Sequence, residues 1–213
     1  MTIIEYILYY PVLWSGLFSF GLALSRARVS AYKKQLLLSV MLLSIVSVMG
    51  QYFELVYLFG IVLPISASLC FWLIFKFRPF HAILIGQSVY ASGGFSEILY
   101  NSVAAGFRLE QMLYYLQNDI AMVGILIGLQ HMGLYALLHR LRLGFTFISP
   151  SLANHKTRYP RTWFVLALGI SFLLAMINIS VYFTSKLLII ILIVHTVCWL
   201  IILFLSYRKE LED

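Results

Sequence analysis

The feature that most constrains this chain is a series of apolar runs, nearly all of them long enough to cross a lipid bilayer, separated by short breaks. A helix that crosses the hydrocarbon core needs about 20 mostly apolar residues. The 213 residues are 62% hydrophobic and 11% charged, with a mean hydropathy of +0.94, which is more apolar surface than a soluble domain of this length can bury. Because backbone polar groups must be satisfied within hydrocarbon, the sequence predicts an all-α, polytopic transmembrane helical bundle.

Seven such runs fill the chain and leave room only for short loops, so we expect a single transmembrane domain over 1–213. The second and third runs lie close together, with Gly60 and Pro64 near their junction. They are therefore also compatible with one hairpin that turns within 51–60, and six spans remain the alternative. The predicted spans are 3–24, 35–58, 60–75, 81–103, 118–138, 162–184 and 187–206.

The basic residues predict the orientation. If the N-terminus lies outside, all of the 15 Lys and Arg residues except Arg108 and Lys186 fall in cytoplasmic segments. This is the asymmetry of the positive-inside rule, so we expect a multi-pass cell-membrane protein with a cytoplasmic C-terminus. Anionic lipid head groups then account for the net charge of +7, and no nucleic-acid partner is expected. The first span carries Glu5 and no basic segment before it, so it is expected to be retained rather than cleaved as a signal peptide.

Glu97 is the most informative single residue, because an ionisable group at membrane depth usually faces the bundle interior or a wet cavity. The pair Gly93–Gly94 precedes it, and glycines permit either a close helix approach or a local break. The alternative is an interfacial carboxylate that reaches water. Its polar neighbours in the same run are Tyr90, Ser96, Tyr100 and Asn101.

Two further acidic residues complete the candidate site. Glu54 is expected at the outer end of the second span, where an interfacial anchor is the alternative reading. Asp119 follows Asn118 in a pair that is typical of a helix start, because these side chains cap free N–H groups. The candidate ligand-binding residues are Glu97, Glu54, Tyr90, Tyr100, Asn101 and Asp119.

The sequence predicts no enzyme, no catalytic residue, no metal and no cofactor. Motifs of nucleotide-binding loops, zinc proteases and serine hydrolases are all missing from it. His195 and Cys198 share one predicted helix face, but a zinc centre needs three or four ligands. His131 is expected to make an interior polar contact between helices, and Cys70 to behave as a small buried hydrophobe.

The last predicted span runs directly into a charged helix start, LIILFLSYRKELED, within Trp199–Asp213. Together with the short-looped spans and the few extracellular residues, this resembles the membrane sensor region of accessory-gene-regulator-type peptide-pheromone receptor histidine kinases. The likeness covers nearly the whole chain. In that family the last helix continues into a dimerisation and kinase region that binds ATP, and this chain stops before that region. The resemblance implies a receptor for a small peptide that signals as a homodimer.

A second likeness is to the propeptide-trimming peptidase of the same signalling systems, which uses a His and a Cys seven residues apart. The segment KFRPFHAILIGQS places His81 seven residues before Ser88. Serine stands where the family has its thiol, and the family's glycine pair before the histidine is absent. A hydroxyl is much harder to activate than a thiol, so we expect His81 to join Lys76 and Arg78 at the inner membrane surface instead.

Four functions follow from these observations. The leading hypothesis is a receptor or sensor-like module that binds an extracellular or membrane-embedded ligand, such as a peptide, and relays binding through the last helix. The second is a transporter, or the substrate-binding membrane subunit of one, which predicts discontinuous helices near the midplane. The others are a degenerate peptidase-like protein and a structural subunit of a membrane complex. Besides the ligand, the expected partners are the lipid bilayer and a second copy or another membrane subunit.

Overall fold

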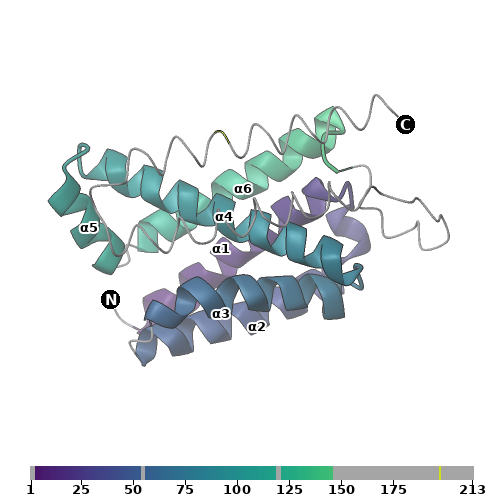
Figure 1. The fold of residues 1–213 in the computed structure, drawn as a ribbon, viewed down its shortest axis with the longest axis horizontal. Coiled ribbons are helices and arrows are strands. Elements are labelled where there is room, and N and C mark those ends of the chain that lie inside the picture. Colours follow the sequence, from purple (N-terminus) through teal and green to yellow (C-terminus); the bar gives the residue numbers. More distant parts are fainter. Residues whose placement is uncertain (1–2, 54–55, 119–120, 146–196, 198–213) are drawn as a thin grey trace.

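The computed structural model describes residues 3–53, 56–118, 121–145 and 197, and all regular elements in these ranges are helices (Figure 1). The expected all-α class is thus confirmed for this part of the chain. The elements are α1 (Ile3–Leu24), η1 (Val29–Ala31), α2 (Lys33–Tyr52), α3 (Val56–Leu69), η2 (Cys70–Ile74), α4 (Pro79–Ala104), α5 (Leu109–Asn118) and α6 (Ala121–Leu141).

Three of the described helices are long and apolar enough to cross a membrane, over Glu5–Leu24, Lys33–Tyr52 and Met122–Leu141. A shorter apolar helical stretch covers Val62–Ile74. The 26 residues of α4 extend about 39 Å, which is also enough to cross, but α4 is not among the three helices that are apolar enough. The three apolar helices indicate a membrane protein.

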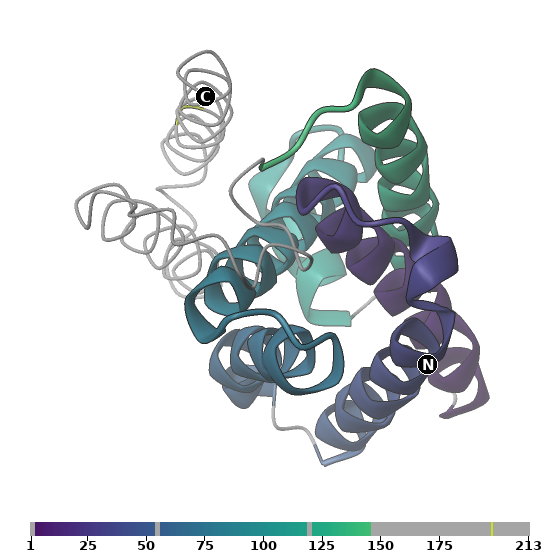
Figure 2. The same ribbon diagram turned by 90° about the vertical axis from the view of Figure 1, so that its right-hand side faces the viewer.

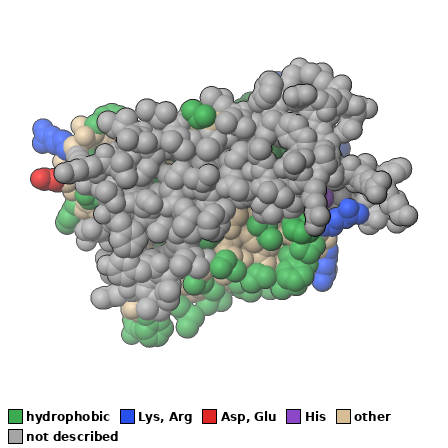
Figure 3. All heavy atoms as spheres, viewed as in Figure 1, with side chains coloured by type: hydrophobic (Ala, Val, Ile, Leu, Met, Phe, Trp, Pro, Cys, Tyr) green, Lys and Arg blue, Asp and Glu red, His purple; other side chains and the backbone are tan. Residues whose placement is uncertain are grey.

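The first helix lies at the centre of the packing. In its most apolar stretch 67% of the residues are buried, against 33% in α2 and 28% in α6. It packs against α6, α2 and α4, while α3 packs on α4 and α2 (Figure 2). Large apolar side chains remain exposed on α2 and α6, and Figure 3 shows hydrophobic side chains along the lower face. Such a surface suits hydrocarbon as its solvent.

The helices α1 and α6 approach closely because glycines face the contact. A Cβ atom on Gly128 would lie 2.6 Å from the carbonyl oxygen of Val12. One on Gly124 would lie 2.5 Å from the ring of Tyr9, and one on Gly16 would overlap the backbone of Gly128. The segment GILIG thus brings two helix backbones together in the small-xxx-small manner of membrane bundles.

The turn between the second and third predicted spans is earlier than expected. The helix α2 ends at Tyr52 and α3 begins at Val56, within the 51–60 segment where a tight turn was considered. These helix ends differ from the predicted span bounds at 58 and 60. Hydropathy does not detect this turn because the residues on both sides of it are apolar. The predicted spans 162–184 and 187–206 lie outside the described residues, apart from Val197.

The helix α6 runs from Ala121 to Leu141, three residues later at each end than the fifth predicted span, 118–138. Asn118 does not start this helix. It ends α5, a short amphipathic helix that lies between the predicted spans 81–103 and 118–138. In α5 only one side is apolar and buried, through Met112 and Leu116, so the segment does not stand out by hydropathy.

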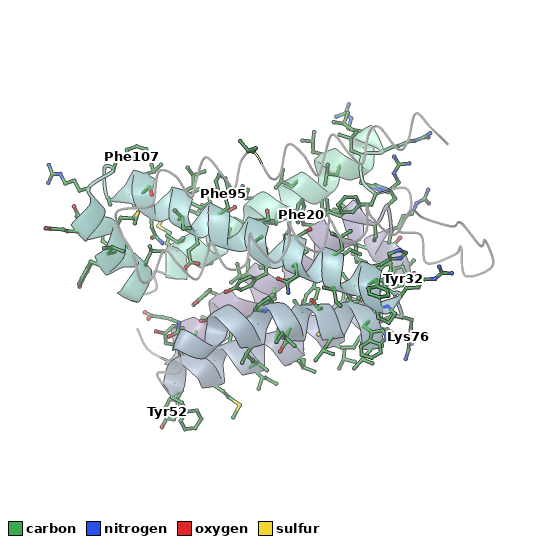
Figure 4. The ribbon with its side chains drawn as sticks, in the orientation of Figure 1. Phe20, Tyr32, Tyr52, Lys76, Phe95 and Phe107 are labelled. Carbon is green, nitrogen blue, oxygen red and sulfur yellow. The ribbon has the colours of Figure 1, made fainter. Side chains whose placement is uncertain are left out.

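The connections collect at two ends of the bundle because successive long helices run in opposite directions (Figure 1). At one end the backbone N–H of Phe145 donates to the carbonyl oxygen of Leu24 at 2.6 Å. The ring of Tyr32 stacks on that of Phe77 at the same end, with centroids 6.4 Å apart, near Lys76 (Figure 4). Partial burial raises the pKa of the Tyr32 phenol. We call this the basic end, since it holds all the described Lys and Arg residues but Arg108, namely Arg26, Arg28, Lys33, Lys34, Lys76, Arg78, Arg140 and Arg142.

Left-handed residues close two helices at the basic end. Arg26 has φ +54° after α1, and Arg142 has φ +55° after α6. The N–H of Ala27 donates to the carbonyl of Leu22 at 2.9 Å, which is the longer hydrogen bond of a helix-ending Schellman turn. Glycine usually occupies the left-handed position of this turn, so a side chain there carries strain.

Candidate functional site

The candidate site is a row of polar residues on α4. Gln87, Tyr90, Gly94, Glu97 and Asn101 follow one another at spacings of three and four, which places them on one face of the helix. We call this row the polar stripe. It includes three of the six candidate residues, Tyr90, Glu97 and Asn101. Gln87 was missed, although its spacing of ten residues from Glu97 would have shown that both share this face.

The glycine pair does not break α4, which continues from Pro79 to Ala104. The reading of Gly93–Gly94 as a local break is therefore wrong. The other reading, a close approach, is confirmed at Gly93, where a Cβ atom would lie 3.2 Å from a methyl group of Leu17 on α1. An unbroken helix keeps the residues of the polar stripe in fixed register.

Two side-chain oxygens on the polar stripe are buried and have no hydrogen-bond partner among the described residues. They are Oε1 of Gln87 and Oδ1 of Asn101, and the Asn101 side chain is only 2% exposed. Leaving a buried acceptor unpaired costs about 1–3 kcal/mol, so each such atom calls for an explanation. Between them, Glu97 is half-buried and acts electrostatically on the phenol of Tyr90.

The helix α5 covers the Asn101 end of the polar stripe. Met112 and Leu116 of α5 pack with Ile98 and Ala105, which lie one turn on either side of Asn101. The hydroxyl of Ser102 contacts the sulfur of Met112 at 3.1 Å. At the same end Phe107 points away from the bundle and is 74% exposed (Figure 4). A short connection thus closes this end of α4.

On the other side of α4, a buried histidine links it to α6. The Nδ1 atom of His131 lies 2.7 Å from the carbonyl oxygen of Ile127, which can only accept, so Nδ1 carries the hydrogen. The Nε2 atom lies 2.9 Å from the hydroxyl of Ser92 and accepts from it when the ring is neutral. The rings of Phe20 and His131 meet edge to face, with their centroids 5.2 Å apart. The expected interior polar contact of His131 is confirmed. Its partner Ser92 lies about 140° around the axis of α4 from Glu97.

The remaining predicted residues lie elsewhere. Tyr100 is half-buried and packs against the main core, next to the polar stripe but not on it. Glu54 and Asp119 lie outside the described residues, so their grouping with Glu97 stays a prediction. His81 and Ser88 stand on one continuous helix, about 10 Å apart along its axis, and Ser88 is fully buried. This separation does not allow His81 to activate the Ser88 hydroxyl.

The part of the chain that the structure describes contains no group of three His, Cys, Asp or Glu residues placed to hold a metal ion. Cys70 is buried, as expected of a small hydrophobe. Comparisons with protein-family models, with curated proteins and with solved structures find no match to this chain.

Proposed function

We propose that this protein is a multi-pass membrane receptor or sensor-like module that binds a ligand along the polar stripe of α4. One observation supports this above the others: a half-buried carboxylate stands between two buried, unpaired amide oxygens on the same face of one helix. Polar groups inside a membrane bundle are expensive and usually mark a ligand or ion site. A bound ligand would pair the oxygens of Gln87 and Asn101.

The packing of α4 supports a relay from this site. Its polar stripe faces one way, while Ser92 on the other side is hydrogen-bonded to His131 of α6 at 2.9 Å. The segment after α6 is in turn bonded to the end of α1 through Phe145 and Leu24. A ligand that moves α4 therefore also acts on contacts that lead to the basic end. Transmission of this kind requires different ligand affinities in two helix arrangements.

The topology proposed with this function has seven spans, an outer N-terminus and a cytoplasmic C-terminus. The gathering of the described basic residues at one end supports that orientation through the positive-inside rule. The test is labelling with a membrane-impermeant maleimide, in a background carrying Cys70→Ser and Cys198→Ser. A cysteine introduced as Glu110→Cys should react in intact cells, whereas Lys34→Cys should react only after lysis. The opposite pattern would reverse the orientation.

Ligand binding is tested on the full chain in phosphatidylcholine nanodiscs with three end-blocked hexapeptides. Each is a serine peptide that carries lysine, glutamate or serine at its third position. At least one should bind saturably, binding should be lost with Asn101→Leu, and Glu110→Gln on the exposed side of α5 should leave it unchanged. For a relay, the same peptide should change the maleimide reaction rate of Arg142→Cys. If none of the three peptides binds saturably, the proposal is contradicted.

A transporter receives no support from the glycine pair Gly93–Gly94. Transporters of the broken-helix type bind substrate where a helix unwinds near the midplane. The glycine pair in α4 offered that break, and α4 is continuous there. The receptor therefore remains the function that the described geometry supports best.

A further inference from the structure

We propose that the basic end holds a binding site for an anionic phospholipid with two phosphate groups, of the cardiolipin type. This site is separate from the polar stripe and does not depend on the proposed receptor function. Two pairs of exposed cations, an aromatic contact between them and an exposed apolar column beside each pair support it. The four cations, which we call the double cation site, are Lys33, Lys34, Lys76 and Arg78.

The double cation site joins two stretches of chain that are far apart in sequence. Lys33 and Lys34 open α2, whereas the other two residues lie in the connection between η2 and α4. All four side chains are exposed. The site attracts anions, and no carboxylate of the described ranges lies near enough to neutralise it. Those carboxylates all lie toward the opposite end of the bundle, at Glu5, Glu97 and Glu110.

An aromatic contact brings the two cation pairs together. Tyr32 directly precedes Lys33, and Phe77 separates the two cations of the other pair. The rings of Tyr32 and Phe77 stack with their centroids 6.4 Å apart, and Phe77 is buried in the core. Figure 4 shows Tyr32 and Lys76 close together at this end of the bundle. Like charges held together repel each other, so a ligand that brings one anionic group to each pair stabilises this arrangement.

An exposed apolar column leads from each cation pair toward the middle of the bundle. On α2 the column reaches from Lys34 to Ile45, about 17 Å along the helix axis. This is the depth of one leaflet, since the hydrocarbon core is about 30 Å thick. The second column follows α3 and η2 to Lys76, and α2 packs against both of these elements. Figure 3 shows Lys and Arg side chains at one end of the hydrophobic lower face. The columns consist of Leu37, Met41 and Ile45, and of Ile65, Leu69 and Trp72, which are 41–64% exposed and follow one another at spacings of three or four.

A lipid of the cardiolipin type matches these features together. Its two phosphates correspond to the two cation pairs, and its acyl chains correspond to the two apolar columns. Basic pockets between membrane helices on the cytoplasmic side bind such head groups, and the proposed orientation places the basic end on that side. A lipid with a single phosphate pairs with only half of the cations, whereas free phosphate leaves both apolar columns uncovered.

The test is native mass spectrometry of the full chain from detergent micelles in about 0.15 M ammonium acetate, where charges more than about 8 Å away are largely screened. Cardiolipin should bind the wild type more tightly than phosphatidylglycerol supplied at equal phosphate concentration. Lys33→Gln with Lys34→Gln, or Lys76→Gln with Arg78→Gln, should weaken cardiolipin binding at least about ten-fold, because each pair supplies charge-assisted hydrogen bonds. Lys33→Arg with Lys34→Arg keeps both charges and should retain the affinity to within about three-fold.

The matched control is Arg140→Gln with Arg142→Gln, which removes the same charge from the basic end outside the double cation site and should change the affinity less than about two-fold. If this control weakens binding as much as the site variants do, the attraction belongs to the whole basic end and the proposal is overturned. Loss of binding in the arginine variant would contradict a site that recognises charge. Equal affinity for cardiolipin and phosphatidylglycerol would refute a ligand with two phosphates, and displacement of the lipid by millimolar inorganic phosphate would refute a lipid site.

Discussion

Replacing Gly128 with alanine tests the close crossing of α1 and α6, on which the central position of α1 depends. The added Cβ atom would lie 2.6 Å from the carbonyl oxygen of Val12 and 3.1 Å from the Cα atom of Leu13. Both are backbone atoms of a packed helix and cannot rotate away. The helices must separate by about 0.8 Å, the difference between 2.6 Å and the 3.4 Å at which ordinary contact begins.

A gap of this size forfeits about a quarter to a half of the dispersion energy of the atoms it separates. Overpacking costs roughly 1–3 kcal/mol, and the better helix propensity of alanine offsets up to about 1 kcal/mol of it. We therefore expect Gly128→Ala to lower the free energy of unfolding by about 1–2 kcal/mol.

The matched control is Gly133→Ala on the same helix, where an added Cβ atom would meet nothing within 4 Å. This variant should keep only the propensity term and gain up to about 1 kcal/mol. Both are measured by reversible unfolding in mixed micelles with rising dodecyl sulfate, followed by tryptophan fluorescence and far-ultraviolet circular dichroism. Equal unfolding midpoints for Gly128→Ala and Gly133→Ala would refute the close crossing.

Three further variants are measured by the same titration. Ser47→Ala removes the hydroxyl that accepts the hydrogen bond of the buried Trp14 indole N–H at 3.0 Å, and should lower the free energy of unfolding by about 1 kcal/mol. The control is Ser15→Ala, whose hydroxyl bonds within its own helix, and an equal or larger loss in that control would contradict the prediction. Arg26→Gly relieves the strain of a side chain at φ +54° and should raise the free energy of unfolding by about 1 kcal/mol. An unchanged or lower unfolding midpoint would contradict the left-handed conformation of Arg26. Gly144→Ala should lower the free energy of unfolding by about 1–3 kcal/mol, because Gly144 has a φ of +142° and an added Cβ atom would lie 2.7 Å from the nearest α1 carbonyl oxygen. A variant as stable as the wild type would contradict this packing of Gly144 on α1.

Hydropathy predicted most of the described helices because lipid exposure depends on composition along a helix. The first predicted span, 3–24, coincides with α1, and the fourth, 81–103, differs from α4 by two residues at its start and one at its end. Prediction was poorest where chain geometry decides a boundary. The turn after Tyr52 lies between two apolar segments, and α5 buries only one side, so neither changes the average hydropathy enough to be seen.

The candidate site was predicted by residue type and refined by geometry. Glu97 was identified because charge is rare inside a membrane span, and Asn101 followed as its polar neighbour. Helical spacing applied to every polar residue of α4 would have excluded Tyr100 from this face and included Gln87. The crossing glycines were also missed, although Gly124 and Gly128 form a small-xxx-small pair that a search for helix-contact motifs detects.

The bond from Phe145 to Leu24 has a consequence for biogenesis. The first helix leaves the ribosome about 120 residues before the segment that closes its final turn, and its glycine face finds Gly128 only when α6 has emerged. During that interval the glycine face of α1 and the carbonyl oxygen of Leu24 lack the partners that they have in the folded protein. Long delays between partner segments slow assembly and invite wrong pairing. We therefore expect pairing of α1 with other membrane helices to compete with folding until α6 has emerged.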